Sequence, residues 1–300
     1  MRTKDVNRVY LFSIFIYLIG AAIIAFFVPA FVASPIGSVL TAQGLILLAV
    51  VVGCRMLRVE PRAHLGIRRV RPGAVGCTML CTAALYPFLA VVSTLMQQFV
   101  TTGTGTLTVS LTDGNPLRNL LVYALLPAAA EELLNRGLLL NAYVRTVGRR
   151  AAVLLSALLF GLFHMNLDQF AYTFIFGLFL CLVMTATESI FACIAGHFTL
   201  NMISVLLATL STDETDLTQI TLVGTQTSLV LITLLVLVTA ALVFAVSFRQ
   251  LLALGCGAEA FRDSFSESAR TGRSDRIVTT ELVFAILICI LYMVAYEAVM

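Results

Sequence analysis

Nine apolar runs, separated by short polar segments, dominate this sequence. They occupy residues 9–32, 37–53, 74–99, 120–143, 151–165, 168–187, 189–209, 227–246 and 279–299. Because a helix needs about 17–25 apolar residues to cross a bilayer, the pattern predicts an all-α, polytopic transmembrane bundle of about eight or nine helices. A transmembrane β-barrel is excluded, since its strands alternate apolar and polar residues and these runs are apolar throughout.

The predicted helices divide the chain into three parts. Residues 1–119 form N-terminal transmembrane helices with a basic loop, and residues 120–209 form a core that carries the polar motifs. Residues 210–300 form C-terminal helices and include a polar segment at 247–278. The count falls from nine to eight if the first run, the last run or the turn at 187–188 is not part of a full crossing.

Composition agrees with a chain that lies mostly in lipid. Hydrophobic residues make up 60% of the 300 residues and charged residues only 12%, whereas a soluble domain is about half apolar and about one quarter charged. The formal net charge of +3 says little by itself, because the placement of the charges matters more than their sum. We expect no nucleic-acid partner. We therefore expect the lipid bilayer, and a substrate in or at the membrane, to be the partners of this protein.

Basic residues predict the orientation of the helices. Segments 1–8, 54–73, 144–150 and 247–278 hold 17 of the 19 lysines and arginines, and such residues stay on the cytoplasmic side of short loops. The pattern therefore predicts an integral protein of the cell (plasma) membrane with a cytoplasmic N-terminus. We expect His64, in the basic loop, to be solvated, and 247–278 to be a solvated linker rather than an amphipathic surface helix.

The fourth run contains the strongest chemical signal, because it carries Glu131, Glu132 and Arg136 at membrane depth. Charged residues are costly there and usually functional. Residues four apart share a helix face, which predicts an ion pair between Glu132 and Arg136 and a hydrogen bond between Glu131 and Asn135. Glu131 then faces the bundle interior and suits the role of a general base. The alternative is that both glutamates serve only helix packing.

Two later runs add histidines. His164 follows Phe160 by one turn, and His197 precedes Asn201 by one turn, so each pair lies on one helix face. An imidazole beside an amide suits hydrogen-bond donation to an oxyanion. With a rise of about 1.5 Å per residue, these side chains and Glu131 reach similar depths, which predicts a mid-membrane active site.

Taken in order, Glu131-Glu-x-x-x-Arg, Phe160-x-x-x-His and His197-x-x-x-Asn resemble the motifs of the CPBP family. This family comprises the CAAX prenyl proteases and bacteriocin-processing enzymes and is also called the ABI family. The resemblance implies intramembrane proteolysis, in which Glu131 and His164 activate water. His197 and Asn201 would hold the oxyanion, and Glu132, Arg136 and Phe160 would support the site. It also implies a cavity open to the cytoplasm, where prenylated substrates lie.

Several alternatives remain open at this stage. The preferred mechanism uses no cofactor, but Glu131, His164 and His197 also make a conceivable zinc site. The chain could instead be a non-catalytic membrane scaffold or bacteriocin-immunity protein of the same fold. A proton-coupled transporter is the third class, since buried glutamates and histidines also relay protons.

Overall fold

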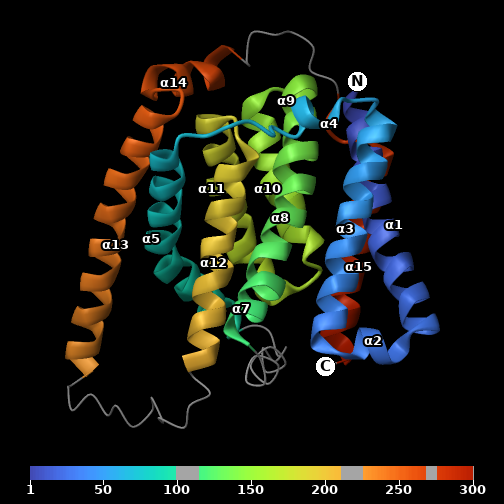
Figure 1. The fold of residues 1–300 in the computed structure, drawn as a ribbon, viewed down its shortest axis with the longest axis horizontal. Coiled ribbons are helices and arrows are strands. Elements are labelled where there is room, and N and C mark those ends of the chain that lie inside the picture. Colours follow the sequence, from blue (N-terminus) through green and yellow to red (C-terminus); the bar gives the residue numbers. More distant parts are fainter. Residues whose placement is uncertain (99–114, 211–225, 268–275, 300) are drawn as a thin grey trace.

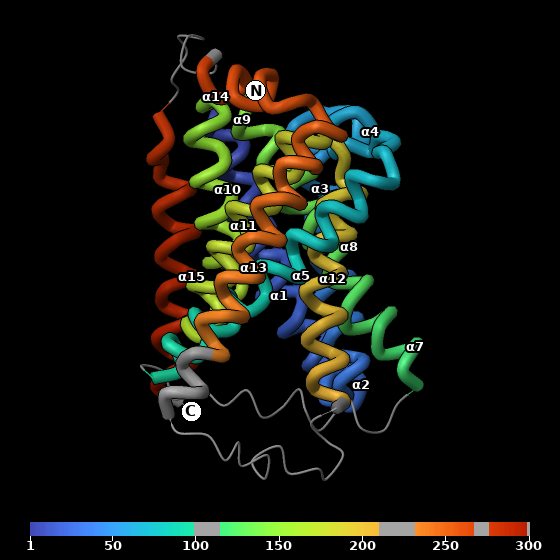
Figure 2. The backbone as a smooth tube through the Cα atoms, turned by 90° about the vertical axis from the view of Figure 1, so that its left-hand side faces the viewer, coloured from blue at the N-terminus to red at the C-terminus, as the bar shows by residue number. Residues whose placement is uncertain are grey.

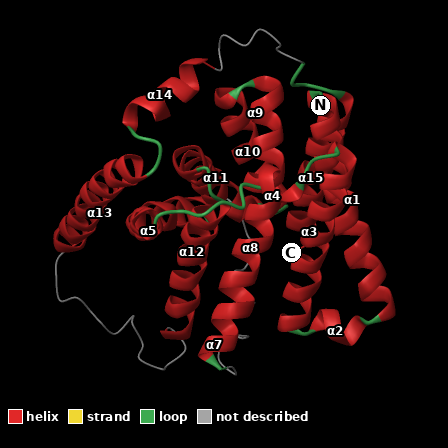
Figure 3. Cartoon of the chain, turned by 45° about the horizontal axis from the view of Figure 1, so that its top comes forward, coloured by secondary structure: helices red, strands yellow, loops and turns green. Residues whose placement is uncertain are grey.

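The computed structural model describes residues 1–98, 115–210, 226–267 and 276–299, and these residues form helices joined by short loops, with no strand among them (Figures 1 and 3). The helices are α1 (Thr3–Phe27), α2 (Pro29–Ala33), α3 (Pro35–Leu57), α4 (Pro61–His64), α5 (Pro72–Met96), α7 (Pro116–Asn119), η1 (Leu120–Leu125), α8 (Leu126–Glu132), η2 (Leu133–Leu140), α9 (Asn141–Val147), α10 (Arg149–Phe163), α11 (Leu167–Thr187), α12 (Ile190–Leu210), α13 (Gln226–Leu254), α14 (Ala258–Glu267) and α15 (Thr280–Val299). η1 and η2 are π-helical. The fold is therefore the all-α membrane bundle that the sequence predicts.

Seven of the described helices are long and apolar enough to cross a membrane, namely α1, α3, α5, α11, α12, α13 and α15. The fourth predicted crossing is also helical, but it is divided into consecutive α and π segments from α7 to α9. The fifth, α10, has only 15 residues. All nine apolar runs are thus helical in the described structure, and the chain is an integral membrane protein.

Prolines fix where many of these helices begin. Pro29, Pro35, Pro61, Pro72 and Pro116 each occupy the first position of a helix. This position suits proline, because its missing N–H would have no partner inside the helix and its backbone angle is already helical.

The helices form a bundle whose two ends differ in content. α1, α3 and α15 lie on one side, α5 and α13 on the other, and α8 to α12 lie between them (Figure 1). The N-terminus, α4, α9 and α14 lie at one end, which we call the basic end, while α2, α7 and the C-terminus lie at the opposite end (Figures 1 and 2). The described parts of the segments that contain the predicted cytoplasmic arginines gather at the basic end.

The prediction that His64 is solvated is wrong. Its side chain is only 2% exposed, and its Nε2 donates to the Leu138 carbonyl oxygen at 3.1 Å. In return, the Asn141 amide donates to the His64 carbonyl oxygen at 2.7 Å. These two bonds attach the basic loop to the helix that carries the glutamates, so the loop is part of the folded core.

The prediction of a solvated linker at 247–278 is wrong over most of the described part of that segment. α13 continues to Leu254, and α14 spans Ala258–Glu267, whereas residues 268–275 lie outside the described residues. Phe261 of α14 packs edge-on against Phe248 of α13 and against Phe265. Aromatic burial on one face makes α14 the amphipathic helix that was the less favoured alternative.

Candidate active site

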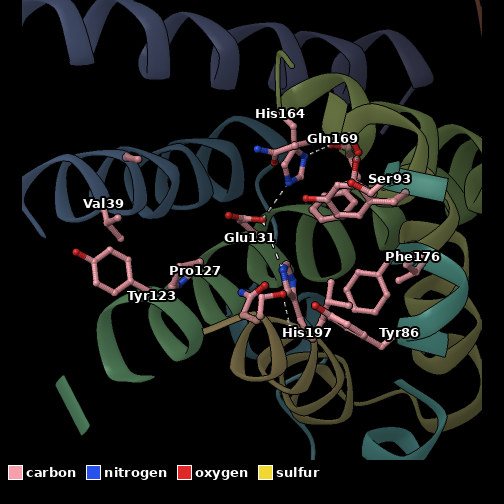
Figure 4. Close-up of a pocket in the computed structure, with 18 of the residues that line it drawn as sticks. Val39, Tyr86, Ser93, Tyr123, Pro127, Glu131, His164, Gln169, Phe176 and His197 are labelled. Atoms are coloured by element: carbon pink, nitrogen blue, oxygen red, sulfur yellow. Dashed lines mark hydrogen bonds and ion pairs between the residues drawn. The ribbon is translucent and has the colours of Figure 1, made fainter. Parts of the chain in front are cut away.

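A cavity of about 670 Å³ opens into the bundle among α1, α3, α5, α8, α10, α11 and α12. Glu131, His164, His197 and Asn201 all line it, so the structure brings together residues that are up to 70 positions apart. Figure 4 shows Glu131 between the two imidazoles, on the wall of this cavity. The convergence of three helices on one space is the feature from which the chemistry of the site follows.

Glu131 lies at equal distances from both histidines. Its Oε2 is 3.9 Å from Nε2 of His164 and 3.9 Å from Nε2 of His197. These separations are too long for direct hydrogen bonds, and they leave room for a small polar molecule that contacts all three groups. The other oxygen, Oε1, accepts a hydrogen bond of 3.3 Å from the Gln43 amide on α3.

Glu132 and Arg136 form a fully buried ion pair behind the cavity wall. The Arg136 Nη1 donates to Glu132 Oε1 at 2.7 Å, and both side chains are 0% exposed. The guanidinium also lies 4.2 Å from the centre of the Phe160 ring and donates from Nη2 to the Gly177 carbonyl oxygen at 3.1 Å. The predicted pair is therefore confirmed, and its guanidinium has two further contacts, with the Phe160 ring and the Gly177 carbonyl oxygen.

His197 joins this pair to the cavity. Its Nδ1 lies 2.8 Å from Glu132 Oε1, the same oxygen that accepts from Arg136. Because a carboxylate can only accept, Nδ1 carries a proton and Nε2 points toward Glu131. The His197 ring also packs edge-on against Phe160 and Phe176, which fixes its plane.

His164 also turns its Nε2 toward Glu131, but a backbone carbonyl group rather than a carboxylate fixes its ring. Its Nδ1 lies 2.8 Å from the Phe160 carbonyl oxygen, so this nitrogen carries the proton and Nε2 faces Glu131. The Phe160 ring lies edge-on against the imidazole, with ring centres 4.8 Å apart. The Phe160–His164 spacing in the sequence therefore supplies both the tautomer and the ring position.

One predicted contact differs from the expectation. Asn135 does not bond the carboxylate of Glu131; its amide donates to the backbone carbonyl oxygen of Glu131 at 2.8 Å. This leaves the carboxylate free to turn into the cavity. Asn201 lines the cavity and uses one amide hydrogen for a 3.4 Å bond to the Ala124 carbonyl oxygen, so its second N–H remains available.

The helix that carries the glutamates changes its winding on both sides of them. α8 ends at Glu132 and is flanked by the π-helical segments η1 and η2. π-Helical turns are rare and frequently occur at functional sites. Here η2 contains Arg136 and the seven residues around it, nearly all of them buried.

Sequence reasoning missed two residues that shape the site. Gln43 is 7% exposed and is the only amide side chain in the second run, which was a usable signal. Gly177 lies against Arg136, and a Cβ built on it would meet the Phe160 ring at 3.2 Å and Arg136 Nη2 at 3.3 Å. Only the packing of α11 against α10 shows why this position is a glycine.

The described residues contain no group of three or more His, Cys, Asp and Glu side chains that could hold a metal ion. Glu131, His164 and His197 come nearest, but Zn²⁺ needs each ligand atom at about 2.0–2.2 Å. Separations of 3.9 Å between the carboxylate and each imidazole are wider than a tetrahedral site with such bonds provides. In their present positions these residues do not fit the zinc site.

Comparison with known proteins agrees with this arrangement. Residues 113–203 match the model of the family described as type II CAAX prenyl endopeptidase Rce1-like, which covers the helices from α7 to α12 that carry all three motifs. No curated protein and no solved structure matches the chain. In this segment the chain is therefore similar to the Rce1-like type II CAAX prenyl endopeptidases, which are peptide hydrolases.

Proposed function

We propose that this protein is an intramembrane endopeptidase whose nucleophile is a water molecule activated by Glu131 and His164. The observation that carries the proposal is the position of Glu131 Oε2, 3.9 Å from each of two imidazole nitrogens, on the wall of a cavity. A carboxylate and an imidazole in this geometry can bind one water and accept its proton. The segment 120–209 is then the catalytic core of the chain.

The oxyanion is held by His197 and Asn201. Because Nδ1 of His197 donates to Glu132, the ring can also donate from Nε2 only when both nitrogens are protonated. With a protonated His197, the charges of Glu131, Glu132, Arg136 and His197 sum to zero. A neutral group of buried charges is what a membrane interior favours.

The proposed reaction then uses only side chains of this chain and one water molecule. Glu131 takes a proton from the water molecule as the water oxygen attacks the carbonyl carbon of the substrate. The negative charge then develops on the carbonyl oxygen of the substrate, between His197 and Asn201. As the C–N bond breaks, Glu131 returns the proton to the leaving amine. Hydrogen bonds to the oxyanion are effective here because the site is largely shielded from bulk water.

The substrates we propose are peptides or proteins that are associated with the membrane, including lipidated ones, in the cell membrane. Apart from Glu131 and the two histidines, the cavity is lined by uncharged side chains, among them Tyr17, Tyr86 and other tyrosines. The other lining residues are serines, threonines, amides and apolar side chains, and such an uncharged lining of mixed polarity suits an uncharged peptide segment that lies in or at the bilayer.

The test is a comparison of membrane peptides in cells that make the wild-type chain, Glu131→Gln or Glu259→Gln. Loss of a general base reduces the rate by about 10²–10⁴-fold, so peptides cut by the wild type should persist uncut with Glu131→Gln. Glu259 is an exposed carboxylate on α14 and serves as the matched control. A scaffold would be indifferent to both changes, and identical cleavage in all three strains contradicts the proposal.

Metal dependence is tested separately on the purified protein. We expect cleavage to continue after exhaustive chelation, because the proposed steps use only protein groups and water. Loss of cleavage on chelation, with recovery on adding zinc, would contradict this part of the proposal and leave the role of the cavity intact.

A further inference from the structure

The two ends of the bundle carry very different charge. At the basic end, Arg8 pairs with Glu281, Arg68 pairs with Glu188, and Arg71 donates to the Leu254 carbonyl oxygen. These contacts place the N-terminus and the polar segments that follow α3, α11 and α13 at one end. Among the described residues, Arg118 of α7 is the only lysine or arginine at the opposite end.

This asymmetry predicts which end lies in the cytoplasm. Short loops rich in lysine and arginine are retained on the cytoplasmic side of a membrane. The structure strengthens the inference from sequence, because it shows that segments far apart in the chain share one end. The basic end is therefore the cytoplasmic end.

The cavity extends away from the basic end. α3 and the helix that begins at α7 start at the opposite end, whereas α5 and α12 finish there (Figure 1). The lining residues on α3 lie near the start of that helix, as Ser38 does, and those on α5 lie in its later half, as Thr94 does. On α12 the lining runs from His197, in the first half of the helix, to Ser204, in the later half. These three residues are exposed, whereas His197 and Leu200, deeper in the same cavity, are buried. The mouth therefore lies at the end opposite to the N-terminus.

Two expectations from the sequence thus exclude each other, since a cytoplasmic N-terminus and a cavity open to the cytoplasm cannot both hold in this fold. We propose that the cavity opens on the non-cytoplasmic side and that the site takes peptide segments presented from that side. Exported peptides and the outer parts of membrane proteins fit this requirement, whereas a lipidated tail on the cytoplasmic surface does not. The substrate class in this inference rests on the proposed peptidase function, but the direction of opening does not.

The lining of the cavity adds a restriction on the substrate. Among its lining residues Glu131 is the only acidic one, and none is a lysine or an arginine. The charge of a protonated His197 is already balanced within the buried group that includes Glu131, so an acidic substrate side chain would add a negative charge that no other cation in the lining compensates. We therefore expect the segment that enters the cavity to lack acidic residues.

The direction of opening is tested by cysteine labelling in spheroplasts of a bacterial host. Ser38→Cys, Thr94→Cys and Ser204→Cys would each be made in a Cys256→Ser background, because Cys256 is an exposed native thiol at the basic end. Ser266→Cys, also exposed but on α14, is the matched control for the basic end. The probe is a membrane-impermeant maleimide, applied before and after the membrane is permeabilised.

We expect labelling of the cavity positions in intact spheroplasts, and labelling of Ser266→Cys only after permeabilisation. The reverse pattern would overturn the proposal, and so would failure of all three cavity positions to react in either state, because an open mouth must admit the probe. The direction in which the cavity opens is separated from the peptidase activity by repeating the labelling in the Glu131→Gln variant, which should show the same labelling pattern as the wild type. If the expected labelling persists while wild-type protein cuts no membrane peptide, the direction of opening stands and the peptidase proposal fails.

Discussion

α11 and α13 are similarly apolar helices, yet they occupy opposite environments. In α11, 56% of the most apolar stretch is buried inside the protein, whereas in α13 the share is 6%. α11 brings Gly177 against Arg136 and Phe160, while α13 presents large side chains such as Leu235 and Leu242 outward. In a membrane, helices approach closely through small residues rather than through apolarity itself.

This difference shows that hydropathy locates the membrane helices but does not show which of them form the buried functional core. What marks the functional core is the presence of polar, small and ionisable residues inside apolar runs. α13 has Arg249 as its only ionisable residue, near its end, and it contributes no residue to the cavity lining. Matched substitutions in the core and on α13 therefore test whether the core residues determine the stability and the catalytic activity of the protein.

The largest expected effect on stability comes from Arg136→Gln. This change takes the guanidinium away from Glu132 and leaves the buried group with one uncompensated negative charge, and breaking a buried pair costs about 3–5 kcal/mol. The matched change Arg249→Gln on α13 removes an exposed charge and should alter stability by about 0.5 kcal/mol or less. Unfolding in detergent measures both, and equal small losses would show that the buried ion pair does not stabilise the core.

The next effect concerns catalysis. Asn201→Ala removes one proposed oxyanion donor and should reduce the turnover rate about 10²–10³-fold, with unfolding nearly unchanged. Gln250→Ala removes an exposed amide from α13 and should leave turnover intact. Peptide cleavage by purified proteins checks this prediction, and a fully active Asn201→Ala would remove this residue from the oxyanion site.

A smaller effect is expected from Gly177→Ala. The added methyl group would meet the Ala157 backbone and the Phe160 ring at 3.2 Å, and overpacking of this kind costs about 1–3 kcal/mol. Ala245→Val adds more volume on the exposed surface of α13 and should be tolerated. The comparison fails if the α13 variant loses as much stability as Gly177→Ala.

The smallest effect is a dependence of stability on pH. Burial lowers the pKa of His64, and its Nδ1 has no hydrogen-bond partner that could accept a second proton. In the unfolded chain the pKa of His64 is about 6.5, so the free energy of unfolding should fall as the pH drops below this value. His64→Gln should flatten this dependence, and an unchanged pH profile would exclude His64 as its source.

The sequence predicted much of the fold, because runs of this length and apolarity have few alternatives to membrane helices. It also predicted the Glu132–Arg136 pair and the shared face of Phe160 and His164, since both depend on spacing within one helix. It did not predict the bond from Gln43 to Glu131, the bond from His197 to Glu132, or the docking of His64. Each of these joins segments far apart in the chain, and helical periodicity contains no information about such partners.

The most direct test of the central claim is hydrolysis by the purified chain in lipid vesicles, in water enriched in ¹⁸O. The products would be identified by mass spectrometry for wild type, Glu131→Gln and Glu259→Gln. Wild type and Glu259→Gln should form a new carboxyl group that contains ¹⁸O, and Glu131→Gln should form it about 10²–10⁴-fold more slowly. A Glu131→Gln protein that forms the labelled product at the wild-type rate would contradict the account.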